Sequence, residues 1–320
     1  MTTAVGLSLD TLSLTQQGRV LTAAFDDPPN HFLSLRLIKD LDRLTRAADR
    51  DPSVGAVVLT GTGEKFVSHS EPEQVSLFFE MSTPPMPNRL VRWSIKANNA
   101  AMRVPALLKM TEKRGGDWGT GIVYSALLKR TIMRMHRSGV VYIAAINGAA
   151  LGGGLELALF FDLRIAADSD HVRLGLIEIL AGLIPGGGGT LRLPALLGMA
   201  AALEHMLEGR PFTAKEALEA GLVHRLVPSA DLLDTAQASA ARIAHRSPYA
   251  VSALKQAVYF NGHRTLPAAL DFELASFIAT GRNPKKGAIA SAFREDVERL
   301  GDTPFVSDIE PWIAGTKGQG

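Results

Sequence analysis

The sequence predicts a layered α/β protein followed by a helical C-terminal region. Short apolar runs rich in β-branched residues, at 54–60 and 140–146, have the pattern of strands that are covered on both faces. Amphipathic helical stretches alternate with them, and successive strand and helix units mark a layered α/β core. After residue 210 the strand signal nearly vanishes while helical periodicity continues. These observations predict a core over residues 1–210 and a helical region over residues 211–320.

The first unit begins with two strands and a breaker. Alternating residues predict strands at 12–15 and 19–25, and a Gln-Gly pair predicts the turn between them. The proline-rich run 26–30 ends this hairpin. Apolar residues then recur at helical spacing with charged residues between them, which predicts an amphipathic helix before the strand at 54–60. The apolar positions of that helix are Leu37, Leu41, Leu44 and Ala48.

Two further units and a run of helices follow. The second unit is a strand at 140–146, a glycine-rich turn at 148–154, a helix at 155–161 and a strand at 163–166. The third passes from residue 172 through 178–183 and a glycine loop at 186–189 into a helix that ends near 197. Helical periodicity then covers 213–220, 232–244, 248–260 and 266–279, and Thr213 with Glu216 forms a capping-box pattern at the first of these.

Residues from about 76 to 138 fit neither pattern and are predicted to be an insertion in the core. The segment contains a proline cluster at 84–87, a glycine-rich run at 114–121 and helical stretches around them. Long insertions are often functional. A lid over a pocket and an inert surface excursion both remain open.

Composition excludes several classes of function. The 320 residues are 46% hydrophobic and carry a formal charge of +2 without a basic block, so neither nucleic-acid nor membrane binding is expected. Absence of cysteine excludes disulfides and thiolate sites, and no two histidines have the i, i+4 spacing of a helical metal site. Neither a signal peptide nor a membrane span is visible. We therefore expect a cytoplasmic protein without a metal or cofactor.

The glycine clusters indicate an anion-binding turn. Gly152-Gly153-Gly154 precedes a predicted helix, but Leu157 stands where a dinucleotide-binding loop needs its third glycine. The loop at 186–189 lacks the lysine of a nucleotide phosphate loop. Glycines after a strand allow close approach of the backbone to a ligand, and a helix N-terminus presents unpaired N–H groups. Such a turn suits an oxygen that gains negative charge in a transition state.

Two glutamates accompany this turn. Glu156 lies in the first turn of the predicted helix, and its position alone favours capping or complementation of the helix dipole. Glu178 lies in an apolar run, where a carboxylate is either well paired or chemically used. Two carboxylates beside an anion hole would suit proton removal next to a carbonyl, or addition of water across a double bond.

These blocks resemble the enoyl-CoA hydratase/isomerase (crotonase) family. The stretch 144–156 is similar to its signature, 178–193 to its second block and 207–223 to the helical block that follows, while Asn30 and 51–66 match earlier blocks. Together they cover most of the chain outside 76–138 and the extreme termini. The resemblance implies a crotonase-type ββα spiral core, assembly as a homotrimer or hexamer, and an acyl-CoA thioester as substrate, with coenzyme A present only as part of that substrate.

The resemblance also assigns roles to residues. Ser70 and Gly153 match the two backbone N–H groups of the oxyanion hole, and Glu156 and Glu178 match the two catalytic glutamates of hydratases. Retention of both glutamates favours a lyase of the hydratase type in fatty acid metabolism. The alternatives are an isomerase, hydrolase or lyase that acts on an unusual acyl thioester, and a catalytically inactive binding homologue.

Three positions depart from the family pattern. His69 replaces a glycine before the first oxyanion amide; we expect it to be a packing residue, and contact with the substrate is the alternative. Glu73 stands where the family often has a lysine for the phosphates of coenzyme A, so a thioester on a carrier protein stays open. Leu176 replaces a polar residue that often helps to hold the water.

Overall fold

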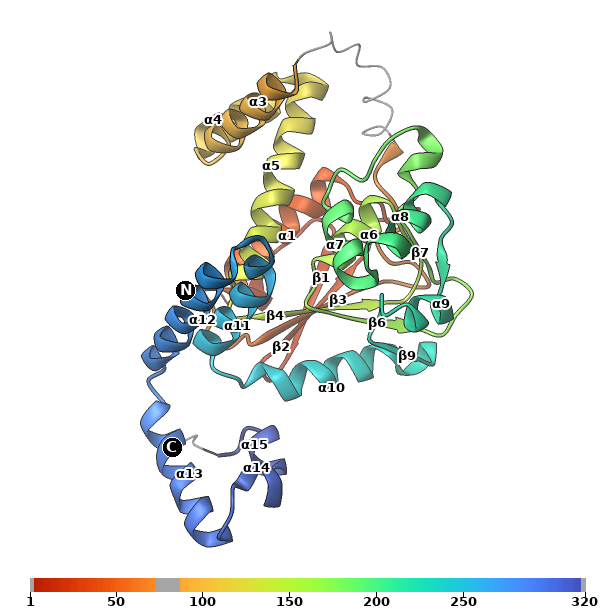
Figure 1. The fold of residues 1–320 in the computed structure, drawn as a ribbon. Coiled ribbons are helices and arrows are strands. Elements are labelled where there is room, and N and C mark those ends of the chain that lie inside the picture. Colours follow the sequence, from red (N-terminus) through yellow and green to blue (C-terminus); the bar gives the residue numbers. More distant parts are fainter. Residues whose placement is uncertain (1–2, 73–86, 318–320) are drawn as a thin grey trace.

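A six-stranded sheet forms the centre of the molecule, which is described here by a computed structural model over residues 3–72 and 87–317 (Figure 1). Its strand order is β1-β2-β3-β4-β6-β9. β1 pairs antiparallel with β2, and each later neighbouring pair is parallel. The strands are β1 (Leu12–Gln17), β2 (Val20–Phe25), β3 (Ala56–Gly61), β4 (Val141–Ile146), β6 (Leu163–Ala167) and β9 (Arg225–Val227). The predicted α/β class is confirmed.

Helices enclose this sheet. α10 packs against β2, β3 and β4 and lies along one side of the sheet in Figure 1, while α1 packs against α5 on the other. Every residue of β4 is buried, as expected of a central strand in a parallel sheet. The helices of the core are α1 (Leu35–Ala48), α5 (Gly116–Arg137), α6 (Gly153–Leu159), α7 (Gly189–Leu197), α8 (Met199–Glu208), α9 (Ala214–Glu219) and α10 (Leu232–Ala244).

A second, three-stranded sheet sits beside the glycine-rich turn. It consists of β5 (Ala150–Leu151), β7 (Arg173–Gly175) and β8 (Phe212–Thr213), in that order. β5 runs directly into α6, which begins at Gly153, two residues before the predicted start. The helix can include Gly153 and Gly154 because both lack the Cβ atom that would clash with the neighbouring segment. Gly152 therefore lies at the junction of strand and helix.

Local capping explains where two helices begin. The Ser34 side chain accepts a hydrogen bond from the Leu37 amide at the start of α1. At α9, Thr213 and Glu216 form the predicted capping box, because each side chain accepts a hydrogen bond from the other residue's backbone N–H. Each cap satisfies amides that the first turn of a helix leaves without a partner.

The described part of the predicted insertion is a set of three helices. α3 (Asn88–Ala101) and α4 (Pro105–Arg114) contain no buried residue, and they lie at the end of α5 that is farther from the sheet (Figure 1). The other half of α5 is packed into the body through Val123, Leu127 and Met135. Residues 73–86 lie outside the described part of the chain, and Glu73 is among them.

The C-terminal region is helical, as its periodicity predicts. α11 (Pro248–Phe260) and α12 (Leu266–Ala279) have the predicted bounds, and α13 (Lys286–Leu300), α14 (Pro304–Ser307) and α15 (Glu310–Ile313) follow. In Figure 1 the chain from α12 to α15 extends away from the sheet. β9 and α10 also follow residue 210, yet they belong to the main sheet and its cover. A domain boundary near 210 stays a prediction.

Candidate functional site

The glycines of the turn allow two segments to approach each other closely. A Cβ atom on Gly153 would lie 2.3 Å from Ser70 Oγ, and one on Gly154 would lie 2.0 Å from the Val67 carbonyl oxygen. Gly152 has a φ of +50°, which side chains other than glycine rarely adopt. Any larger residue here would separate the start of α6 from the segment 67–70.

Backbone hydrogen bonds fix that segment between two neighbours. The amide of Leu33 donates to His69 O at 2.7 Å, and the amide of Ser68 donates to His31 O at 2.9 Å. On its other side, the amide of Leu151 donates to Ser68 O at 2.8 Å. The segment 67–70 is thereby held at the edge of the small sheet, beside the start of α6.

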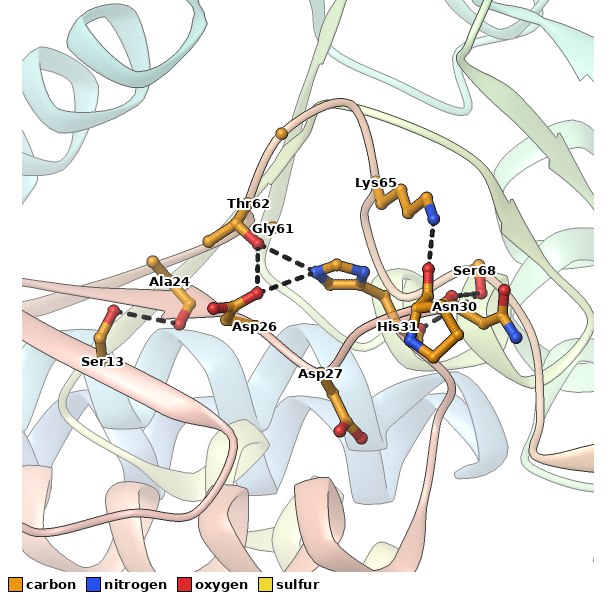
Figure 2. Close-up of polar contacts among 12 residues, drawn as sticks. Ser13, Ala24, Asp26, Asp27, Asn30, His31, Gly61, Thr62, Lys65 and Ser68 are labelled. Carbon is orange, nitrogen blue, oxygen red and sulfur yellow. Dashed lines mark hydrogen bonds and ion pairs between the residues drawn. The ribbon is translucent and has the colours of Figure 1, made fainter.

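Side chains anchor the loop at 26–31 to the same region (Figure 2). Lys65 Nζ donates to the Pro29 carbonyl, and Ser68 Oγ donates to the Asn30 carbonyl. His31 Nε2 lies 3.0 Å from the hydroxyl of Thr62, which in turn donates to Asp26. Burial lowers the pKa of His31, so its neutral form dominates near pH 7. This network positions the chain that leads to Ser70.

The two residues predicted to form the oxyanion hole lie beside each other. Ser70 Oγ faces the Cα atom of Gly153, and Gly153 is the first residue of α6. Within residues 3–72 and 87–317, neither the amide of Ser70 nor that of Gly153 donates a hydrogen bond. A free N–H group at a helix N-terminus, together with a second free N–H group nearby, can stabilise an oxygen that acquires negative charge.

Glu156 is buried and held by a different helix from its own. Its Oε1 atom accepts hydrogen bonds from the amides of Gly187, at 2.7 Å, and Gly189, at 2.8 Å. Gly189 begins α7, so the carboxylate caps α7 rather than α6. Burial to 6% exposure raises the pKa of Glu156, and the loop amides oppose that rise. The predicted helix cap is therefore formed on α7, and Oε2 takes part in neither of these two hydrogen bonds.

Glu178 has a different environment. It begins the short 3-10 helix η2 (Glu178–Ala181), and its Oε1 lies 3.3 Å from the position of a Cβ on Gly152. Its Oε2 is buried and has no hydrogen-bond partner among the described residues. Burial, with a smaller contribution from the charge of Glu156, raises the pKa of Glu178 to about 7. A carboxyl group with this pKa can give or take a proton near neutral pH.

His69 is close to the same glycine. Its Nδ1 lies 2.8 Å from the Ser70 carbonyl oxygen, and its Nε2 lies 3.2 Å from the position of a Cβ on Gly152. Among the described residues other than glycine, only His31 has a positive φ. His69 therefore stands in place of the family's glycine without adopting a left-handed backbone conformation. The imidazole adds a polar ring beside the glycine turn.

Sequence reasoning missed Tyr124, which lies on α5 inside the insertion. Its hydroxyl hydrogen-bonds with the Ser70 side chain, and burial together with the nearby charge of Glu156 raises the pKa of Tyr124. The phenol is therefore neutral and reaches the oxyanion turn. The one signal in the sequence was that Tyr124 lies at helical spacing from Leu127 and Thr131, both of which are buried, so that the three residues share one face of α5.

Leu176 departs from the family pattern in the structure too. Its side chain is buried and would lie 2.7 Å from a Cβ on Gly189, so it packs against the loop that holds Glu156. Within the described part of the chain, no cluster of three or more His, Cys, Asp or Glu could hold a metal ion. Nor is any helix there long and apolar enough to cross a membrane.

Comparisons with known proteins assign this chain to one class. Residues 112–298 match the family model described as enoyl-CoA hydratase/isomerase. The chain is 30% identical to the "Probable enoyl-CoA hydratase" of Bacillus subtilis (strain 168), over 96% of this chain and 100% of that one. It is 32% identical to the "Short-chain-enoyl-CoA hydratase" of Clostridium acetobutylicum, over 85% and 89%.

A solved structure agrees with these relatives. The crystal structure of an enoyl-CoA hydratase from Bacillus anthracis superposes with a TM-score of 0.69 at 28% identity, covering 90% of this chain and 97% of that one. The chain belongs to the enoyl-CoA hydratase/isomerase family, and its fold is the crotonase fold, as the sequence predicts.

Proposed function

We propose that this protein is an enoyl-CoA hydratase-like lyase, which adds water across the double bond of an α,β-unsaturated acyl-CoA. The observation that carries the proposal is the meeting of two different carboxylates at one glycine turn: Glu178 against Gly152, and Glu156 in the first turn of the helix that Gly153 begins. Family membership and the relatives named as hydratases support it. No cofactor is required, since coenzyme A is part of the substrate.

The amides of Ser70 and Gly153 would bind the thioester oxygen. As electrons move toward the carbonyl, this oxygen gains negative charge, and two N–H donors stabilise the enolate more strongly than the neutral ground state. Burial of the turn strengthens both hydrogen bonds because water does not compete for them.

The glutamates would divide the proton chemistry. Glu156 is fixed through Oε1, so Oε2 is the atom available to hold a water and accept its proton during attack on Cβ. Glu178, with its pKa of about 7, carries a proton often enough to deliver it to Cα. The product then carries the elements of water, and the site is restored when Glu156 releases its proton to solvent and Glu178 takes one up; the reverse sequence eliminates water.

The decisive experiment supplies crotonyl-CoA to the purified protein and follows loss of the conjugated thioester absorbance. Hydration that disappears in both Glu156→Gln and Glu178→Gln supports the assignment of both carboxylates. Full activity in Glu178→Gln would overturn that assignment, and no hydration of short-, medium- or long-chain enoyl-CoAs would overturn the hydratase proposal.

Double-bond isomerisation is the second candidate. Leu176 favours it, because this apolar side chain packs on the loop of Glu156 where a polar residue would help to hold water. Conversion of a 3-enoyl-CoA to the 2-enoyl isomer without formation of the hydroxyacyl product would select this candidate over hydration.

We also propose a homotrimer or hexamer. Apolar side chains of α8 and α12 are exposed in the single chain, and contact with other copies would bury them. They are Met199, Leu203, Leu207, Leu266, Leu270, Leu274, Phe277 and Ile278. Light scattering of the purified protein measures the number of subunits, and a monomer would overturn this proposal. A cytoplasmic location stays a prediction from the sequence.

A further inference from the structure

His69 has a defined hydrogen-bonding state. Its Nδ1 lies 2.8 Å from the carbonyl oxygen of Ser70, and a carbonyl oxygen can only accept. Nδ1 therefore carries a hydrogen. In the neutral ring the other nitrogen, Nε2, then has a free lone pair and can accept a proton.

That free nitrogen is turned toward the site. Nε2 of His69 lies 3.2 Å from the position of a Cβ on Gly152, and Oε1 of Glu178 lies 3.3 Å from the same position. Both atoms border this position, from two different segments of the chain, but they form no direct hydrogen bond or ion pair with each other. Because Gly152 has no side chain, nothing from this residue separates the imidazole from the carboxyl group.

The surroundings of the two groups are complementary. Glu178 Oε2 is buried without a partner among the residues the structure describes, and only the backbone amide of Glu178 itself favours the anion of this carboxyl group. His69 is half-buried and therefore retains contact with solvent. Its backbone is fixed by the hydrogen bond from Leu33 to its carbonyl oxygen. A proton on Glu178 thus has a route outward through the ring.

We propose that His69 is a second proton-transferring side chain of this site, which takes a proton from Glu178 through an intervening water beside Gly152 and exchanges it with solvent. This inference rests on the proposed enolate chemistry. Glu178 gives its proton to the intervening water as that water gives one of its own protons to Nε2, which leaves a carboxylate, an intact water and an imidazolium. The imidazolium then releases the Nε2 proton to water and returns to the neutral ring. No oxidant or further reactant is needed.

The relay has a measurable consequence at the substrate. Without a relay, the proton on Glu178 exchanges with solvent more slowly, so the carboxyl group more often returns the same proton to Cα. With the relay, the proton is lost to solvent, so a saturated acyl-CoA in heavy water acquires deuterium at Cα. Deuterium uptake therefore reports the relay separately from hydration, which reports the oxyanion hole and the two glutamates.

The variant that tests the relay is His69→Asn. The asparagine amide corresponds in position to Nδ1 and can still donate to the Ser70 carbonyl, while the Nε2 atom is lost. We expect deuterium uptake by butyryl-CoA to fall by about 10-fold or more relative to hydration of crotonyl-CoA. His171→Asn is the matched control, because His171 is exposed and pairs with Glu64 outside the site. It should leave both rates unchanged.

A second variant, His69→Gly, restores the residue that the family has here and leaves a space beside Gly152. Added imidazole should recover deuterium uptake in this variant and leave the wild-type rate unchanged. Equal changes in uptake and hydration, or uptake that persists in His69→Asn, would show that His69 only packs, and the proposal would be overturned.

The wild-type rates distinguish this inference from the proposed function. Hydration without any deuterium uptake would overturn the relay and leave the hydratase proposal intact. Uptake that depends on His69, without hydration of any enoyl-CoA, would support the relay and overturn the hydratase proposal. Absence of both activities in the folded wild-type protein would overturn both.

Discussion

Glu156 and Glu178 have the same side chain and opposite surroundings. The first is anchored by the amides of Gly187 and Gly189, whereas the second has one oxygen buried without a partner in the described structure. Hydrogen bonds to a carboxylate favour its charged form, and burial without them favours the neutral form. The difference supports the proposed division of roles, in which one carboxylate stays in place as an acceptor while the other changes its protonation state.

Removal of the mobile proton should have the largest effect. Glu178→Gln keeps the size of the side chain but cannot exchange a proton, so hydration of crotonyl-CoA should fall by roughly 10²–10⁴-fold. Deuterium uptake at Cα should be lost with it. Steady-state kinetics and mass spectrometry measure the two. A variant that still takes up deuterium at the wild-type rate would mean that another group removes the Cα proton.

Displacement of the anchored carboxylate comes next. A Cβ atom on Gly187 would lie 2.8 Å from Glu156 Oε2, so Gly187→Ala should push the carboxylate away from its water position. Hydration should fall by about 10²-fold while deuterium uptake persists. Gly186→Ala is the control, because a Cβ there meets nothing within 4 Å. Parallel loss of both activities in Gly187→Ala would contradict the division of roles.

The pH dependence separates the two carboxylates by their protonation. Because the pKa of Glu178 is raised to about 7, deuterium uptake, which needs the carboxylate, should increase as pH rises through 7. The raised pKa also means that the folded protein binds this proton more tightly than the unfolded chain does. Its stabilising contribution is present below pH 4.5 and is lost as pH rises through 7.

Thermal denaturation from pH 4.5 to pH 8 tests that sign. Wild type should lose stability relative to Glu178→Gln over this window, since glutamine binds no proton. The increase of deuterium uptake with pH reports the titration of Glu156 and Glu178 as a coupled pair, because the charge of Glu156 contributes to the raised pKa of Glu178. Wild type that instead gains stability relative to Glu178→Gln as pH rises from 4.5 to 8 would contradict the raised pKa.

The smallest effect is expected at the oxyanion turn. Tyr124→Phe removes the hydroxyl that bonds with the Ser70 side chain, a loss of about 1 kcal/mol, or roughly fivefold in kcat/KM. Both activities should fall together, because both need the enolate. Tyr249→Phe is the matched control, since Tyr249 is exposed on α11. An unchanged rate in Tyr124→Phe would assign the tyrosine to packing alone.

Local signals explain which predictions from sequence succeeded. α10, α11 and α12 have their predicted bounds because their periodicity and flanking residues act within a few positions along the chain. The capping box at Thr213 is confirmed for the same reason. Tyr124 and the partners of Glu156 were not predictable, because their contacts join residues tens of positions apart.

The sequence by itself determined the α/β class, the glycine-rich turn between strand and helix, and the resemblance that singles out Ser70, Gly153, Glu156 and Glu178. Periodicity, turn chemistry and motif order carry that information without knowledge of packing. Only the tertiary structure decided that Glu156 caps α7, that Glu178 Oε2 has no partner among the described residues, and that the side chains of His69 and Glu178 both border Gly152. Burial and pairing set the pKa of a carboxylate, and both are properties of contacts between distant segments.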